Sequence, residues 1–71
     1  MRATLQAIMP YELHGTRYYQ VVYLPDGGAP QQARLSWDMV DADLQPGEVV
    51  EVNAILGIVD GVRRVKAGGG A

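Results

Sequence analysis

Residues 49–66, VVEVNAILGIVDGVRRVK, predict a β-hairpin at the end of the chain. Two runs rich in β-branched residues meet at Asp60-Gly61, a pair typical of a two-residue type I′ turn because both turn positions need a positive φ. Side chains alternate across a strand, so the predicted core face carries Val50, Val52, Ala54, Leu56, Ile58 and Val65. The opposite face is predicted to carry Val49, Glu51, Asn53, Ile55, Arg64 and Lys66.

Three more strands are predicted before this hairpin. Residues 2–9 alternate, with Ala3, Leu5, Ala7 and Met9 on one side, and Pro10 interrupts the pattern, so residues 11–16 are expected to form a loop. Residues 17–24 and 31–37 are the next strands, and the turn-forming sequence PDGGAP separates them. Residues 38–44 lose the alternation and are expected to form one helical turn at most, before a turn at residues 45–47.

The order of these elements predicts the fold class. The predicted class is all-β, with a small five-stranded barrel of OB-fold type. The OB type is predicted because about ten residues between the third and fourth strands suit the crossover that this Greek-key barrel needs. An SH3-like barrel is the alternative fold. Chains of that type often have a tight turn between the third and fourth strands, where the OB-fold has a crossover.

Length and composition predict one domain. Residues 1–66 are expected to form a single small barrel, and residues 67–71, AGGGA, a flexible glycine-rich tail. The absence of cysteine excludes a disulfide scaffold and favours a reducing cytoplasm as the location. No apolar run approaches the roughly 20 residues that a membrane span needs, so no membrane association is expected.

The turn at residues 44–49, LQPGEV, together with chain size and strand order, resembles the small OB-fold proteins of the bacterial initiation factor 1 and S1-domain type. The resemblance covers about the last third of the chain and implies the OB-fold. The pronounced basic character of that family is absent, because six Lys and Arg residues stand against eight Asp and Glu residues, for a net charge of -2. We therefore do not expect its ribosome-binding function.

The first functional hypothesis is a small protein that binds single-stranded nucleic acid. If Val22 pairs with Ala33, then Tyr19, Tyr23 and Arg34 share one face, where phenol rings can stack on bases and the arginine can contact phosphate. Arg64 and Lys66 would contribute further positive charge. A register slip of one residue would instead place the tyrosines in the core, opposite Ala33 and Leu35.

The second hypothesis is a protein-interaction module or accessory subunit. It would self-associate, for example as a homodimer, or bind a protein partner through an edge strand or through Val49, Ile55 and Val62 on the outer face of the hairpin. The negative net charge favours this second hypothesis, and the placement of the aromatic residues favours the first.

Neither an enzyme nor a metal site is expected. Ser36 and Thr16 have no identifiable base, and His14 stands alone in a loop without a nucleophile. The aspartates 38, 41 and 43 lack the glycine and glutamate of a calcium-binding loop, so helix capping and solvent exposure account for them. We expect no cofactor.

Overall fold

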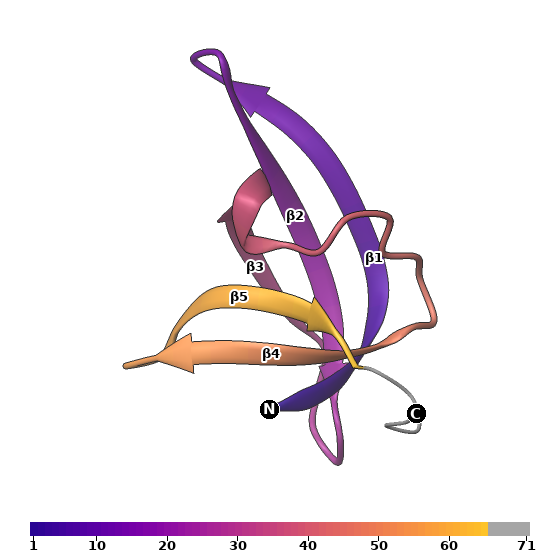
Figure 1. Ribbon diagram of the computed structural model, residues 1–71. Coiled ribbons are helices and arrows are strands. Elements are labelled where there is room, and N and C mark those ends of the chain that lie inside the picture. Colours follow the sequence, from indigo (N-terminus) through magenta and orange to yellow (C-terminus); the bar gives the residue numbers. More distant parts are fainter. Residues whose placement is uncertain (66–71) are drawn as a thin grey trace.

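Five antiparallel strands and one short 3₁₀ helix make up the part of the chain that the computed structural model describes, residues 1–65 (Figure 1). The elements are β1 (Arg2–Leu13), β2 (Thr16–Pro25), β3 (Gln31–Ser36), η1 (Trp37–Met39), β4 (Val49–Ile55) and β5 (Ile58–Arg64). The all-β class and the five strands are confirmed. Lys66 and the tail predicted at residues 67–71 lie outside the described residues. Within residues 1–65, no helix has the length and hydropathy that crossing a membrane requires.

The strands form one sheet in the order β3-β2-β1-β4-β5. The order β3-β2-β1-β4 is that of a Greek key, in which the fourth strand returns by a long connection to lie beside the first. That connection, residues 37–48, contains η1 and crosses over the sheet (Figure 1). The outer strands β3 and β5 form no ladder with each other in the described part of the chain, so the sheet is open there. Val40, just after η1, forms a single parallel bridge with Val62 of β5.

The core lies where the β4–β5 hairpin crosses the other three strands (Figure 1). Every strand contributes to it, and the crossover connection adds two side chains, Val40 and Leu44. The buried hydrophobic residues are Ala3, Leu5, Val21, Tyr23, Leu35, Val40, Leu44, Val50, Val52 and Val62. The chain has no phenylalanine, and so Tyr23 provides the largest of these side chains.

The β1–β2 hairpin is longer than the sequence predicts. The sequence predicts a loop at residues 11–16, but β1 continues through Pro10 to Leu13, and the turn consists of His14 and Gly15 with φ of 53° and 80°. Proline fits here because β4 pairs only with residues 2–4 of β1, so the later part of β1 has a strand neighbour on one side alone.

The register between β2 and β3 differs by one residue from the register on which the nucleic-acid hypothesis depends. Val21, not Val22, pairs with Ala33, and Tyr19 pairs with Leu35. Because paired residues share a face, Tyr19, Val21 and Tyr23 point to the core side. The alternative that the sequence left open, with tyrosines in the core, is therefore the correct one.

The β4–β5 turn lies at Leu56-Gly57, four residues before the predicted position. These two residues have φ of 53° and 81°, as a type I′ turn requires, whereas Gly61 has no positive φ. Asp60-Gly61 lies inside β5, where Asn53 pairs with Gly61 and Ala54 with Val59, so Asp60 is the extra residue of a β-bulge. Val50 and Val52 are in the core as predicted, but Ala54, Leu56 and Ile58 are exposed.

This turn gives a paired test with two glycines. Alanine at position 57 must adopt the left-handed conformation, so Gly57→Ala is expected to lower the free energy of unfolding by about 1 kcal/mol. Gly61→Ala is expected to have a smaller effect, because its Cβ would lie 3.7 Å from the Asn53 Cβ and 3.9 Å from the Met39 carbonyl oxygen, both ordinary contacts. Urea denaturation of both variants measures the difference. The reverse order of effects would place the turn at Asp60-Gly61.

Candidate functional site

Within residues 1–65, the residues predicted to bind nucleic acid do not form one surface. The Tyr23 side chain is only 2% exposed and belongs to the core, so its ring cannot stack on a base. Tyr19 is half-buried and packs against the same core. Arg34 pairs with Gln20 and is exposed on the opposite face of the sheet. The predicted grouping of Tyr19, Tyr23 and Arg34 is wrong because of the one-residue difference in register.

Arg64 is engaged in a clamp that ties the crossover connection to β5. Its Nε donates to Glu48 Oε1 at 2.7 Å, and its Nη2 donates to the carbonyl oxygens of Asp43 at 3.0 Å and Ala42 at 3.3 Å. Its backbone N–H donates to Asp41 Oδ2 at 2.7 Å. With its guanidinium committed to these contacts, Arg64 is poorly placed to contact phosphate. Lys66, its predicted companion, lies outside the described residues.

The carboxylates of this clamp are ionised at neutral pH. Hydrogen bonds from the Arg64 guanidinium and then from the Gln45 backbone N–H hold the pKa of Glu48 below its ordinary value. The backbone N–H of Arg64, helped by the Arg63 guanidinium, lowers the pKa of Asp41 in the same way. Asp41 is thus used to fasten the connection. No group of three or more His, Asp or Glu side chains among residues 1–65 could hold a metal ion.

The three residues predicted to form an interface separate into two environments. Val49 and Ile55 are exposed on β4, as the sequence predicts. Val62 is fully buried, and its predicted outward position is wrong. The reason is the bulge at Asp60, which leaves Val62 opposite the core residue Val52.

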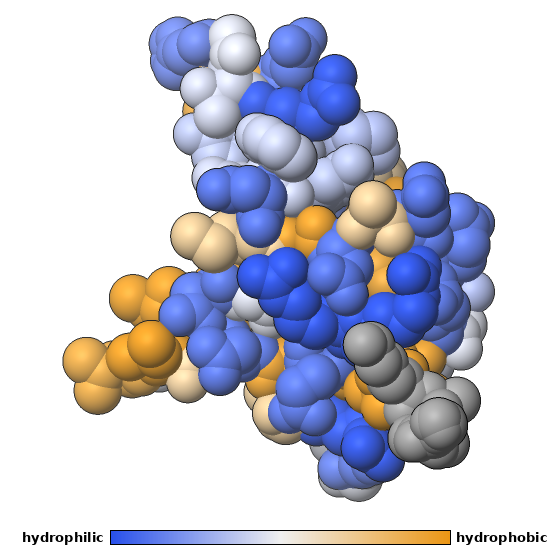
Figure 2. Space-filling model, viewed as in Figure 1, coloured by the Kyte–Doolittle hydropathy of each residue, from blue (hydrophilic) through white to orange (hydrophobic). Residues whose placement is uncertain are grey.

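The free end of the β4–β5 hairpin carries the most exposed aliphatic side chains of the described chain. Ile55 is 59%, Leu56 96% and Ile58 70% exposed, and we call these three residues the apolar tip. Figure 1 shows the hairpin projecting from the rest of the sheet, and Figure 2 shows hydrophobic side chains gathered at its end. A contiguous apolar cluster on a protrusion is typical of an interaction site.

The backbone at Leu56 makes this exposure more informative. Its φ of 53° lies in the left-handed region, which costs an ordinary L-residue about 1–2 kcal/mol. Asparagine, aspartate or glycine would occupy this turn position with less strain and would be more soluble. The Leu56 side chain therefore neither favours the turn conformation nor packs in the core.

Polar groups mark the base of the apolar tip. Asn53 Nδ2 donates to Asp60 Oδ1 at 2.7 Å across the two strands, next to the bulge. This bond joins β4 and β5 below the tip, so the exposed end is held on a paired hairpin.

The sequence predicts part of the apolar tip. Ile55 is predicted on an outer face, but Leu56 and Ile58 are predicted in the core, because the turn is predicted at Asp60-Gly61. The signal for the correct turn is Gly57, a glycine between two aliphatic runs. Comparison of the chain with protein-family models, with curated proteins and with solved structures gives no match.

Proposed function

We propose that this chain is a protein-interaction module that inserts the apolar tip of its β4–β5 hairpin into an apolar pocket of a protein partner. The observation that carries the proposal is Leu56, 96% exposed and held at a positive φ. Transfer of aliphatic side chains from water into a pocket is favourable by about 1.5–3 kcal/mol for each side chain fully buried. Three such side chains on one protrusion supply a compact binding element.

The size of the apolar tip favours a partner with a pocket over a second copy docked tip to tip. A stable interface uses about 20–30 residues on each side, and the tip has three. A concave partner can surround each side chain and so bury more of it. Charge favours a protein over a nucleic acid or an anionic surface. Asp60 is the charged residue of the hairpin nearest the tip, the next pair, Glu51 and Arg63, carries no net charge, and the chain has a net charge of -2.

For the scaffold we propose an OB-type architecture, with an SH3-like barrel as the alternative. The Greek-key order and the crossover connection between β3 and β4 support it. The Val40–Val62 bridge supports it too, since it brings the start of the crossover connection, just after η1, beside β5 at the open side of the sheet. In this scaffold the apolar tip lies where the fourth and fifth strands connect.

The test uses Leu56→Asn, because asparagine fits the turn better than leucine does. The variant is expected to be at least as stable as the wild type in urea denaturation, so lost binding cannot be ascribed to unfolding. A photoreactive benzoylphenylalanine at position 58 is expected to cross-link a partner in the chain's own cells when Leu56 is present. The product should be lost with Leu56→Asn and retained with Leu13→Asn, a matched change at an exposed leucine outside the tip.

Light scattering at rising protein concentration identifies a partner that is a second copy. The chain is expected to stay monomeric. A dimer that Leu56→Asn dissociates would replace the proposed pocket by self-association. Equal cross-linking with and without Leu56 would contradict any role of the apolar tip.

A further inference from the structure

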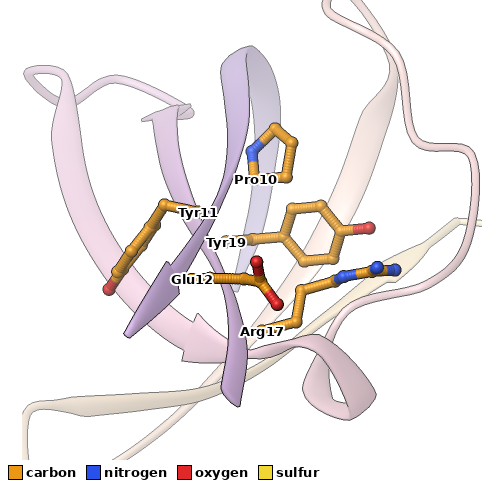
Figure 3. Close-up of a pocket in the computed structure, with 5 residues that line it drawn as sticks. All are labelled: Pro10, Tyr11, Glu12, Arg17 and Tyr19. Carbon is orange, nitrogen blue, oxygen red and sulfur yellow. The ribbon is translucent and has the colours of Figure 1, made fainter. Parts of the chain in front are cut away.

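A groove lies along the far end of the β1–β2 hairpin, away from the apolar tip. Pro10 pairs with Tyr19 and Glu12 with Arg17, so these four side chains share a face, and Figure 3 shows them on one side of the hairpin with Tyr11 on the other. Together with Tyr11, they line an open cleft of about 420 Å³. A second cleft of about 440 Å³ shares Glu12 and Arg17 and reaches Trp37. We call the two together the aromatic groove.

The polar groups of the aromatic groove have no partners within the described residues. The side chains of Glu12, Arg17 and Trp37 form no hydrogen bond or ion pair there, although Glu12 and Arg17 are direct cross-strand neighbours. In Figure 3 the Arg17 guanidinium extends past Glu12 and lies on the same side as the Tyr19 hydroxyl. The groove therefore presents hydrogen-bonding groups that are available to a ligand.

Trp37 makes the groove more unusual. It is the single tryptophan of the chain, yet it stands at the start of η1 and is 58% exposed. A small domain with no phenylalanine gains stability by burying its largest apolar side chain, but this chain buries Tyr23 instead. Tryptophan and tyrosine are enriched at interfaces because each combines a large apolar ring with a polar group.

The composition of the groove matches one class of ligand. Tyr19, Trp37 and Pro10 offer apolar ring surfaces, and the Tyr19 hydroxyl, the Trp37 indole N–H and the Arg17 guanidinium can each donate a hydrogen bond. A polyproline II segment has apolar rings and backbone carbonyl groups that make no internal hydrogen bonds. Aromatic-lined grooves with donors bind such segments in several unrelated domains.

Charge separates this ligand from single-stranded nucleic acid. Binding to a phosphate backbone needs several cations, whereas the groove holds one arginine and one glutamate and the chain as a whole is acidic. Glu12, without a partner of its own, can pair with a lysine or arginine of a peptide. We propose that the aromatic groove binds a proline-rich peptide segment in the polyproline II conformation that carries a basic residue.

The single tryptophan provides the readout. A decaproline peptide with one arginine at its end is titrated into the full chain, and the Trp37 fluorescence is expected to shift to shorter wavelength and to saturate. The control peptide has alanine in place of proline, and a second arm uses a single-stranded oligonucleotide at low salt. The fluorescence is expected to respond to the proline peptide only.

Variants then locate the site, with binding measured by the anisotropy of a labelled peptide. Trp37→Ala and Arg17→Gln are each expected to weaken binding by about tenfold or more. Arg34→Gln, a matched change at an exposed arginine outside the groove, and Leu56→Asn at the apolar tip are expected to leave binding unchanged. Saturable response to the oligonucleotide alone would assign the groove to nucleic acid, and no response to either ligand would overturn the proposal. Both results leave the function of the apolar tip untouched.

Discussion

Tyr23→Ala is expected to lower the free energy of unfolding by about 3 kcal/mol or more, because it removes the largest side chain of the core and leaves a cavity. At about 0.05–0.15 kcal/mol per residue, the whole chain of 71 residues has a total stability of about 4–11 kcal/mol. The substitution therefore removes much of the stability. Thermal and urea denaturation followed by circular dichroism measure the loss.

Two control variants distinguish a core position of Tyr23 from a surface position. Tyr23→Phe keeps the ring and is expected to stay close to wild type, because Tyr23 forms no side-chain hydrogen bond in the described residues that the change would break. Arg34→Ala, on the opposite face, is expected to leave the stability nearly unchanged. If Tyr23→Ala melted with the wild type, the tyrosine would lie at the surface and the register between β2 and β3 would be the one first predicted.

The positions of the strands follow from the sequence to a large extent. β3 begins at Gln31 and β4 at Val49, the positions predicted from the turn residues that precede them. The turn at residues 45–47 is confirmed as well, since Gly47 has a positive φ and the Glu48 N–H donates to the Gln45 carbonyl oxygen at 3.1 Å. These features depend on local chemistry, which a sequence displays.

The faces of the strands follow from the sequence much less well, because a shift of one residue reverses them. A bulge lies between Leu5 and Ala7 in β1, and after it Ile8 packs against the core, while Met9, predicted to share a side with Leu5, is exposed. The β2–β3 register and the bulge at Asp60 have the same kind of effect. Bulges respond to the twist of the sheet and to the packing of distant strands, which local pattern does not report.

The candidate site also combines features that the sequence predicts with features that it does not. The exposure of Val49 and Ile55 agrees with the prediction, because the extra residue of the bulge lies in β5 and β4 keeps its alternation. Their role in binding stays a prediction. Arg64 was predictable as a surface cation, but its contacts with Glu48 and Asp43 depend on where residues 41–48 pass over β5. The aromatic groove likewise requires that β1 continue past Pro10, which the sequence argues against.

Two lysine substitutions on the β4–β5 hairpin are expected to have very different effects on the free energy of unfolding. Val62→Lys places a charge at a fully buried position opposite Val52, and an unpaired buried charge costs about 3–5 kcal/mol, so the protein should lose a large part of its stability of about 4–11 kcal/mol. Ile55→Lys places the same charge at a side chain that is 59% exposed and is expected to change stability by less than about 0.5 kcal/mol, while it abolishes cross-linking to a partner at the apolar tip. Circular dichroism and chemical denaturation of both variants measure the contrast. Equal stability would mean that Val62 lies on the surface beside Ile55, as the turn at Asp60-Gly61 predicts, and would contradict both the bulge at Asp60 and the turn at Leu56-Gly57 that exposes Leu56 and Ile58.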